Sequence, residues 1–182
     1  MIHNSNEVIN DLIKMTKSHI DYANELISIS EEKLQYKQSN ESWSVLECLE
    51  HLNRYAFFYN KEIQKKMQSS SLPFSETFKS SYLGNKFSMD MLPKKGMKTM
   101  KTFKSKNPIN SNLDKEKVIN SFINLQRELL SCLEISKTKN LNKIKTKTTL
   151  PILKFKLGDT FRFVIHHNER HIHQAKQVML GA

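Results

Sequence analysis

Residues 162–178 read RFVIHHNERHIHQAKQV, and this stretch decides how the chain is interpreted. Four of the seven histidines lie within its eight positions from His166 to His173. Positions i and i+4 of an α-helix lie about 40° apart around the axis and about 6 Å apart along it. His167 and His171 meet this condition, so both rings can point at one place. His166 and His173 lie about 100° or more away from that direction.

The face that carries this pair is partly apolar, so we expect it to point into a helical bundle. Two buried imidazoles side by side repel when protonated and need hydrogen-bond partners when neutral. A divalent cation resolves both problems by accepting both lone pairs. An H-x-x-x-H pair is also typical of core or surface histidines, so a third ligand from another helix is needed. The stripe comprises Thr160, Val164, His167, His171, Gln174 and Val178.

Apolar residues recur at helical spacing in four long segments of the chain. We predict helices over residues 6–34, about 45–67, 115–137 and 160–180. Four amphipathic helices pack most simply as an all-α four-helix bundle, and 182 residues suit a single domain spanning 1–182. The expected N-caps are Asn4, Ser5 or Asn6; Ser42 or Ser44, with Glu47 completing a capping box after Ser44; Asp114; and Asp159.

A long irregular connection, residues 69–113, separates the second and third helices. It holds three of the four prolines, and residues 86–106 carry seven lysines and one acid, Asp90. Long loops in compact domains often cover a functional site. We favour a solvated loop over an anion-binding one. Before the last helix, the only strand-like alternation is a weak one at residues 152–157.

The formal net charge of +11 raises the possibility of a nucleic-acid partner. The 29 basic residues comprise 25 lysines and only four arginines, and they are spread along the chain. Arginine is the residue that makes forked contacts to phosphates and bases. We therefore expect no specific nucleic-acid partner.

Only two cysteines are present, Cys48 and Cys132, and both lie in apolar-periodic segments. We predict that they are free and buried, which suits a reducing cytoplasm. The start, MIHNSNEVINDLIK, lacks the apolar core of a signal peptide, and no run of about 18 apolar residues exists. We expect a cytoplasmic protein without a membrane partner.

Two histidines compete for the role of third ligand. His51 interrupts an apolar stripe of the second helix, and His19 lies between Met15 and Tyr22 in the first. A lone inward-facing histidine is more often a hydrogen-bonded core residue than a ligand. Spacing alone does not choose between them.

Two motifs resemble the DinB-like (YfiT-like) family of metal-binding four-helix bundles. They are SWSVLECLEHLN at residues 42–53 and LGDTFRFVIHHNERHIHQA at residues 157–175. The first helix, the third helix and residues 69–113 carry no comparable motif. The resemblance implies a metal held by His51, His167 and His171. The residues that match the family pattern are Trp43, Ser44, His51, Leu52, His167, Arg170, His171 and Gln174.

Three neutral nitrogen ligands suit zinc or nickel first, with iron, cobalt or manganese as alternatives. Three protein ligands also leave positions for water or substrate, as in catalytic rather than structural sites. The resemblance implies hydrolysis or thiol transfer on a small-molecule substrate, with a low-molecular-weight thiol as a second cofactor, and homodimers are common among similar proteins. A non-catalytic metal-binding or interaction module is the alternative.

Each ligating ring has a second nitrogen that needs a partner. Glu47, one turn before His51, is a candidate for orienting that ring or for pairing with Arg170; Gln174, Glu50 and Glu169 are further candidates. We expect Trp43 and Tyr55 to pack in the core. The chain has no nucleophile elbow, P-loop, dinucleotide fingerprint, C-x-x-C pair or H-E-x-x-H motif, and we assign no catalytic side chain.

Overall fold

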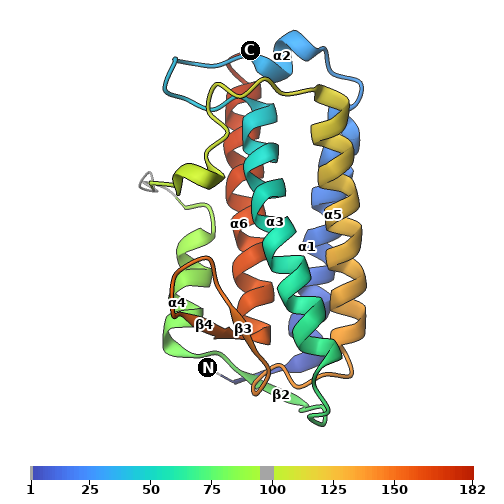
Figure 1. Ribbon diagram of the computed structural model, residues 1–182. Coiled ribbons are helices and arrows are strands. Elements are labelled where there is room, and N and C mark those ends of the chain that lie inside the picture. The colour runs from blue at the N-terminus through green and yellow to red at the C-terminus, as the bar shows by residue number, and fades with distance from the viewer. Residues whose placement is uncertain (1, 95–100) are drawn as a thin grey trace.

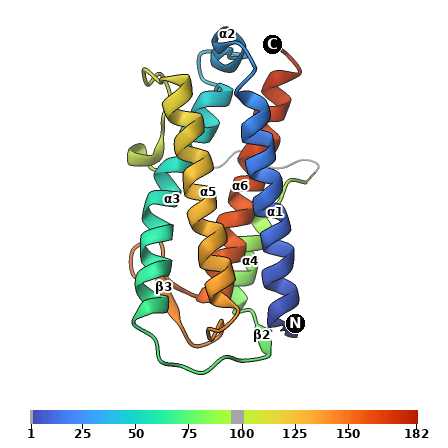
Figure 2. The same cartoon turned by 90° about the vertical axis from the view of Figure 1, so that its right-hand side faces the viewer.

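Four long helices lie side by side and form the body of the molecule (Figures 1 and 2). The computed structural model describes residues 2–94 and 101–182. Each long helix contacts two others, in the cyclic order α1, α5, α3, α6. This confirms the predicted all-α four-helix bundle. The four helices are α1 (Ser5–Leu26), α3 (Val45–Gln68), α5 (Lys115–Ser136) and α6 (Leu157–Met179).

Short elements decorate this bundle. Two small antiparallel sheets lie toward its lower end, where β1 pairs with β2 and β3 pairs with β4 (Figure 1). Helix α4 packs along the outside of α6. The short elements are β1 (Ile2–Asn4), α2 (Glu31–Gln35), β2 (Thr77–Lys79), α4 (Tyr82–Met91), the 3-10 turn η1 (Lys104–Lys106), β3 (Lys145–Lys147) and β4 (Lys154–Lys156).

The direction of the helices explains the long connection. Helices α3 and α5 both run from the upper end to the lower end in Figure 1, so the chain between them must return along the whole bundle. At 1.5 Å per residue the 24-residue α3 is about 36 Å long. The predicted irregular segment 69–113 is this crossover, and it contains β2, α4 and η1. Its residues 95–100, with two of the predicted lysines, lie outside the described residues.

Three of the predicted helix starts are confirmed. The Asn4 side chain accepts from the backbone N–H groups of Asn6 and Glu7, and the Asp114 side chain accepts from Lys117. Ser44 and Glu47 form the expected capping box at the start of α3, and this excludes Ser42 as the cap. These starts could be predicted because side-chain caps are local interactions within four residues.

Two predicted helix boundaries are wrong. The segment 6–34 is not continuous, because α1 ends at Leu26 and α2 restarts after the Ser30 cap. The last helix begins at Leu157, before the predicted Thr160. Asp159 does not cap it; its carboxylate instead accepts hydrogen bonds from Ser80 and Ser81 on the crossover.

The interior consists of two apolar cores with a polar layer between them. The lower core contains Ile9, Ile63 and Leu133, and the upper core contains Leu26 and Leu49. Helix positions between the two cores are occupied by buried polar side chains. Asn168 donates to Gln126 at 2.9 Å, and Asn53 donates to the Val118 carbonyl at 3.0 Å. The layer comprises Thr16, His19, His51, Asn53, Gln126, His167 and Asn168.

Both cysteines are buried and free, as predicted. Burial raises the pKa of the Cys48 thiol and raises that of Cys132 to about 11, so neither is a ready nucleophile at neutral pH. Across the described ranges 2–94 and 101–182, no helix combines the length and apolar character needed to cross a membrane.

The close approach of α4 to α6 generates a stability prediction. A methyl group added at Gly84 would overlap the buried side chain of Asp159, which is held by Ser80 and Ser81. We expect Gly84→Ala to lower the free energy of unfolding by about 1–3 kcal/mol. At an exposed position within a helix, a Gly→Ala change normally raises the free energy of unfolding instead. Urea unfolding measures the difference, with Leu83→Ala on the exposed side of α4 as a control expected to change little.

Candidate metal centre

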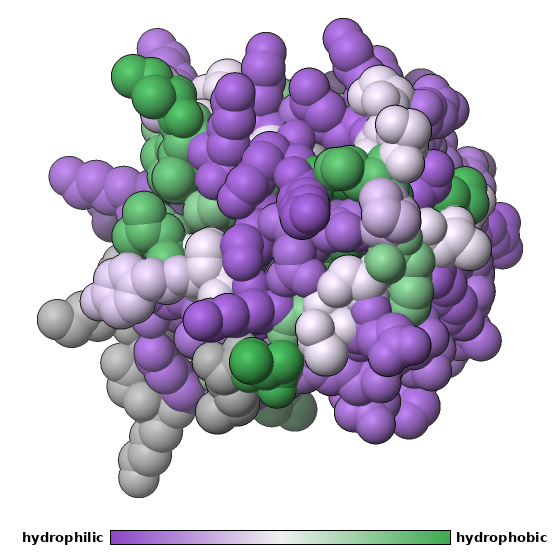
Figure 3. All heavy atoms as spheres, turned by 90° about the horizontal axis from the view of Figure 1, so that it is seen from below, coloured by the Kyte–Doolittle hydropathy of each residue, from purple (hydrophilic) through white to green (hydrophobic). Residues whose placement is uncertain are grey.

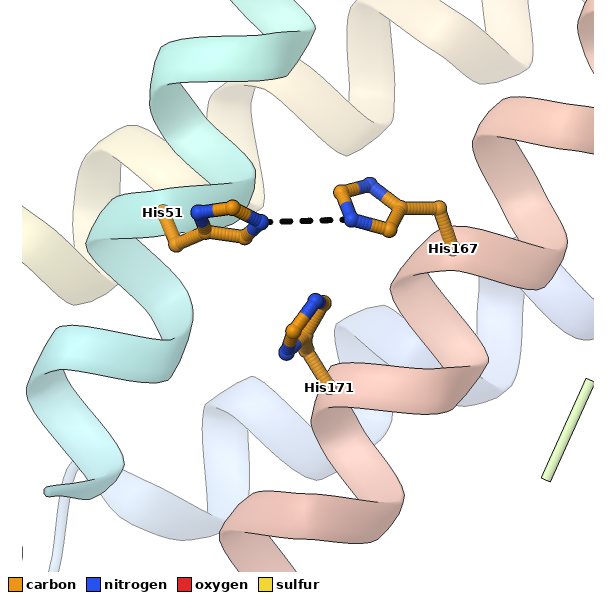
Figure 4. A group of neighbouring side chains, drawn as sticks. All are labelled: His51, His167 and His171. Carbon is orange, nitrogen blue, oxygen red and sulfur yellow. Dashed lines mark hydrogen bonds between the residues drawn. The ribbon is translucent and has the colours of Figure 1, made fainter. Parts of the chain in front are cut away.

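Three histidines converge in the polar layer, between α3 and α6 (Figure 4). His51 comes from α3, and His167 and His171 come from successive turns of α6. Ring centroids lie 4.5–5.1 Å apart, and one ligand atom from each ring lies within 4.8 Å of the others. The Nε2 atoms of His51 and His167 are 3.2 Å apart. The structure therefore brings together the three histidines named from the sequence.

Two of the rings are oriented by hydrogen bonds at their far nitrogens. Nδ1 of His51 lies 2.8 Å from the carbonyl oxygen of Lys106, in η1 of the crossover. Nδ1 of His171 lies 2.9 Å from Oε1 of Gln174. Both partners are acceptors, so each Nδ1 carries the proton. The Nε2 lone pairs of both rings are then available to a ligand.

The site keeps its histidines neutral. Burial lowers the pKa of His51 to about 4 and that of His171 to about 3, and nearby positive groups lower both further. The pKa of His167 lies well below its usual value, first because of burial and then because of His171 and His51. Neutral imidazole is the form that coordinates a metal. At pH 7 no proton has to leave these rings before a cation binds.

Aromatic side chains wall the three histidines. The Trp43 ring lies 4.6 Å from that of His51, and the Tyr55 ring lies 4.9 Å from it. Phe163 stacks on His167, with centroids 6.0 Å apart and planes 9° apart. Trp43 Nε1 donates to the side chain of Asn107, so Trp43 ties the crossover to the start of α3. These rings shield the nitrogens from bulk water and fix the imidazole positions.

The spacing of the nitrogens fits a tetrahedral cation. Zinc–nitrogen bonds of about 2.0–2.1 Å at a tetrahedral angle place two ligand nitrogens about 3.3 Å apart. The 3.2 Å between His51 and His167 matches this value. All three ligand atoms lie within 4.8 Å of one another, a limit wider than this spacing. The donor set could hold a divalent metal.

The remaining candidate ring-orienting residues have other contacts. Glu47 caps α3, forms an ion pair with Lys37 at 2.7 Å and accepts a hydrogen bond from the backbone N–H of Asn110. The prediction that Glu47 orients His51 is therefore wrong, because the Lys106 carbonyl occupies that position. Arg170 donates to the Asp90 carbonyl at 3.3 Å.

Glu50 pairs with Arg54, and Glu169 contacts His19. Of the orienting candidates, Gln174 is the one that the structure places against a ring of the cluster.

His19, the competing third ligand, lies outside the cluster. It is buried on α1 and its Nε2 lies 2.9 Å from Glu169 Oε2, as in a hydrogen-bonded core residue. His166 points toward α4, with Nδ1 2.9 Å from the hydroxyl of Ser88. The sequence interpretation missed the contribution of Lys106, because its backbone carbonyl acts there and carries no residue-specific signal.

Comparison with protein families identifies the superfamily of the chain. The model of the DinB superfamily matches residues 16–175, so the chain belongs to the DinB superfamily. No curated protein and no solved structure gives a match. The matched range includes all three histidines, the whole of α3 and α5, and most of α6, and it begins within α1.

Buried neutral histidines predict a pH dependence for the metal-free protein. Between pH 6.5 and about 4 the unfolded chain takes up protons at these rings while the folded chain does not. Stability is therefore full above pH 6.5 and falls as the pH drops, by up to about 1.4 kcal/mol per pH unit per ring. Thermal unfolding after chelator treatment, from pH 7 to 4, measures this slope.

The loss of stability per pH unit should become smaller in His51→Gln and stay unchanged in His173→Gln, whose side chain is exposed. A melting temperature that does not change between pH 7 and 4 would contradict burial of neutral rings.

Proposed function

We propose that this protein is a divalent-metal-dependent enzyme that acts on a small molecule by hydrolysis or by transfer of a thiol. The observation that carries the proposal is the meeting of three neutral histidines, two of them with the proton fixed on the far nitrogen. Three protein ligands leave coordination positions for water or substrate, as catalytic sites do. Zinc or nickel suits the nitrogen ligands best, with iron, cobalt and manganese as further candidates.

A divalent cation in this position supplies Lewis acidity, which lowers the pKa of a bound water or thiol. The chain supplies the positioning. Lys106 and Gln174 hold the rings in place, and Trp43, Tyr55 and Phe163 limit the access of water. Burial raises the pKa of Tyr55, so its hydroxyl remains a hydrogen-bond donor at neutral pH. Tyr55 is partly exposed beside His51 and His167, where a substrate could accept that hydrogen bond.

A non-catalytic metal-binding module is the second candidate, favoured by the burial of His51 and His167. The two proposals differ in whether exchangeable ligands remain on the metal. Water-proton relaxation of the cobalt- or manganese-loaded protein reports such ligands, and a fully protein-bound shell would support the module. Turnover of electrophilic substrates with a low-molecular-weight thiol, absent in His171→Ala, would support the enzyme.

Removal of one ligand should abolish stoichiometric metal binding. We expect elemental analysis of the purified protein to give about one divalent ion per chain for wild type and far less for His171→Ala, because two nitrogens hold a cation poorly. His173→Ala, two residues further along the same helix with an exposed ring, is the matched control. Equal metal content in wild type and His171→Ala would remove this site as the metal centre.

Loss of the Gln174 contact should weaken the metal without destroying the site. Gln174→Leu keeps the side-chain size but leaves His171 Nδ1 without its acceptor, and such outer contacts are worth about 10- to 100-fold in metal affinity. Competition with a chromophoric chelator measures the dissociation constant. Gln177→Leu, exposed on the same helix, should bind metal as wild type does. If both variants bind equally well, the orienting role of Gln174 is wrong.

A further inference from the structure

The β3–β4 hairpin presents four lysines on its outward face. Thr146 and Phe155 point inward and are buried, so the flanking lysines of each strand point outward. The register places Lys145 opposite Lys156 and Lys147 opposite Lys154. Like charges directly opposite each other on two strands are destabilising. The hairpin therefore keeps an arrangement that folding alone does not favour.

Most of this charge is not neutralised within the molecule. Lys156 donates to the carbonyl of Lys79. Among the ion pairs found in residues 2–94 and 101–182, none involves Lys145, Lys147 or Lys154. All three side chains are exposed. The surface is thus ready to receive anions from outside.

The tip of the hairpin is apolar and is held away from the core. Ile152 is fully exposed, with a relative accessibility of 101%, and Pro151 beside it is exposed too. The φ angle of Ile152 is +68°, a conformation that β-branched residues rarely adopt. Thr149 donates to the Tyr59 hydroxyl and Thr148 to the Leu153 carbonyl, so the base of the tip is fixed. The backbone conformation that exposes the Ile152 side chain to solvent therefore has an energetic cost.

The basic surface continues from the hairpin onto the end of the bundle. A shallow hollow of about 280 Å³ lies between the end of α3 and β3. Lys145 belongs to the hairpin and also lines this hollow. Seen from below, this end is mostly hydrophilic with apolar groups at separate places (Figure 3). The hollow is lined chiefly by Lys66, Ser69, Ser70, Ser71, Lys143 and Lys145.

We propose that the β3–β4 hairpin docks the protein on the surface of an anionic lipid membrane. Ile152 and Pro151 enter the boundary between headgroups and acyl chains, and the flanking lysines contact lipid phosphates. A nucleic acid would bind the lysines but has no use for an exposed apolar tip, and proteins that recognise nucleic acids favour arginine over lysine. The expectation of no membrane partner rested on the lack of a spanning segment, and surface docking does not need one.

Vesicle co-sedimentation tests the proposal with the 182-residue chain. Wild type should bind vesicles of equal parts phosphatidylglycerol and phosphatidylcholine, should not bind pure phosphatidylcholine, and should dissociate at high salt. Ile152→Asn should weaken binding roughly 10- to 100-fold, as expected from loss of one buried side chain. Asparagine tolerates a positive φ, so this variant should melt no lower than wild type. Leu180→Asn removes another highly exposed apolar side chain, far from the hairpin in the sequence, and should bind normally.

Charge is tested separately from the apolar tip. The double variant Lys147→Gln/Lys154→Gln should lose about tenfold or more in affinity, whereas Lys14→Gln/Lys17→Gln on the exposed face of α1 should not. The proposal is overturned if wild type ignores anionic vesicles or if both members of a matched pair lose binding equally. It is also overturned if double-stranded DNA displaces the vesicles from wild type and binds Ile152→Asn as tightly as wild type.

Discussion

The structure depends on the burial of polar side chains at mid-height, between two apolar cores. A polar group buried without a partner costs more than a hydrogen bond contributes, so each member of this layer requires a specific neighbour. Asn168 donates to Gln126 across α6 and α5, and His19 contacts Glu169 across α1 and α6. The lone pairs of the three clustered histidines can all be satisfied only by a partner that the three rings share. The polar contacts that fix the register of the helices therefore also determine the candidate metal site.

The parallel course of α3 and α5 determines what covers that site. A chain that must travel the length of the bundle passes His51 on its way, and there the Lys106 carbonyl receives the ring proton. Trp43 and Asn107 join the same crossover to the start of α3. The topology thus supplies the ring-orienting acceptor that the sequence interpretation assigned to Glu47, and it leaves Glu47 to stabilise the helix start.

Short-range regularities were predictable and long-range ones were not. The i,i+4 geometry of His167 and His171, the Ser44–Glu47 capping box and the four long helices follow from periodicity within a few residues. The choice of His51 over His19 came from a family resemblance, because both occupy inward positions.

The break after Leu26, the contact of Asp159 with Ser80 and Ser81, and the role of the Lys106 carbonyl depend on tertiary neighbours. No local pattern encodes these neighbours. Of the four short strands only β4 was anticipated, by the weak alternation at residues 152–157, since each strand is only three residues long.

The distance along the chain between the clustered histidines has a consequence for biogenesis. His51 and His167 are 116 residues apart, so a ribosome working at about 5–20 residues per second completes the second roughly 6–23 seconds after the first. During that interval the nascent polypeptide offers a single imidazole from this trio and cannot chelate. A cation held by all three rings must be loaded after both α3 and α6 have been made, from whatever the cell then supplies, and the choice of ion reflects that supply as much as the protein's own preference.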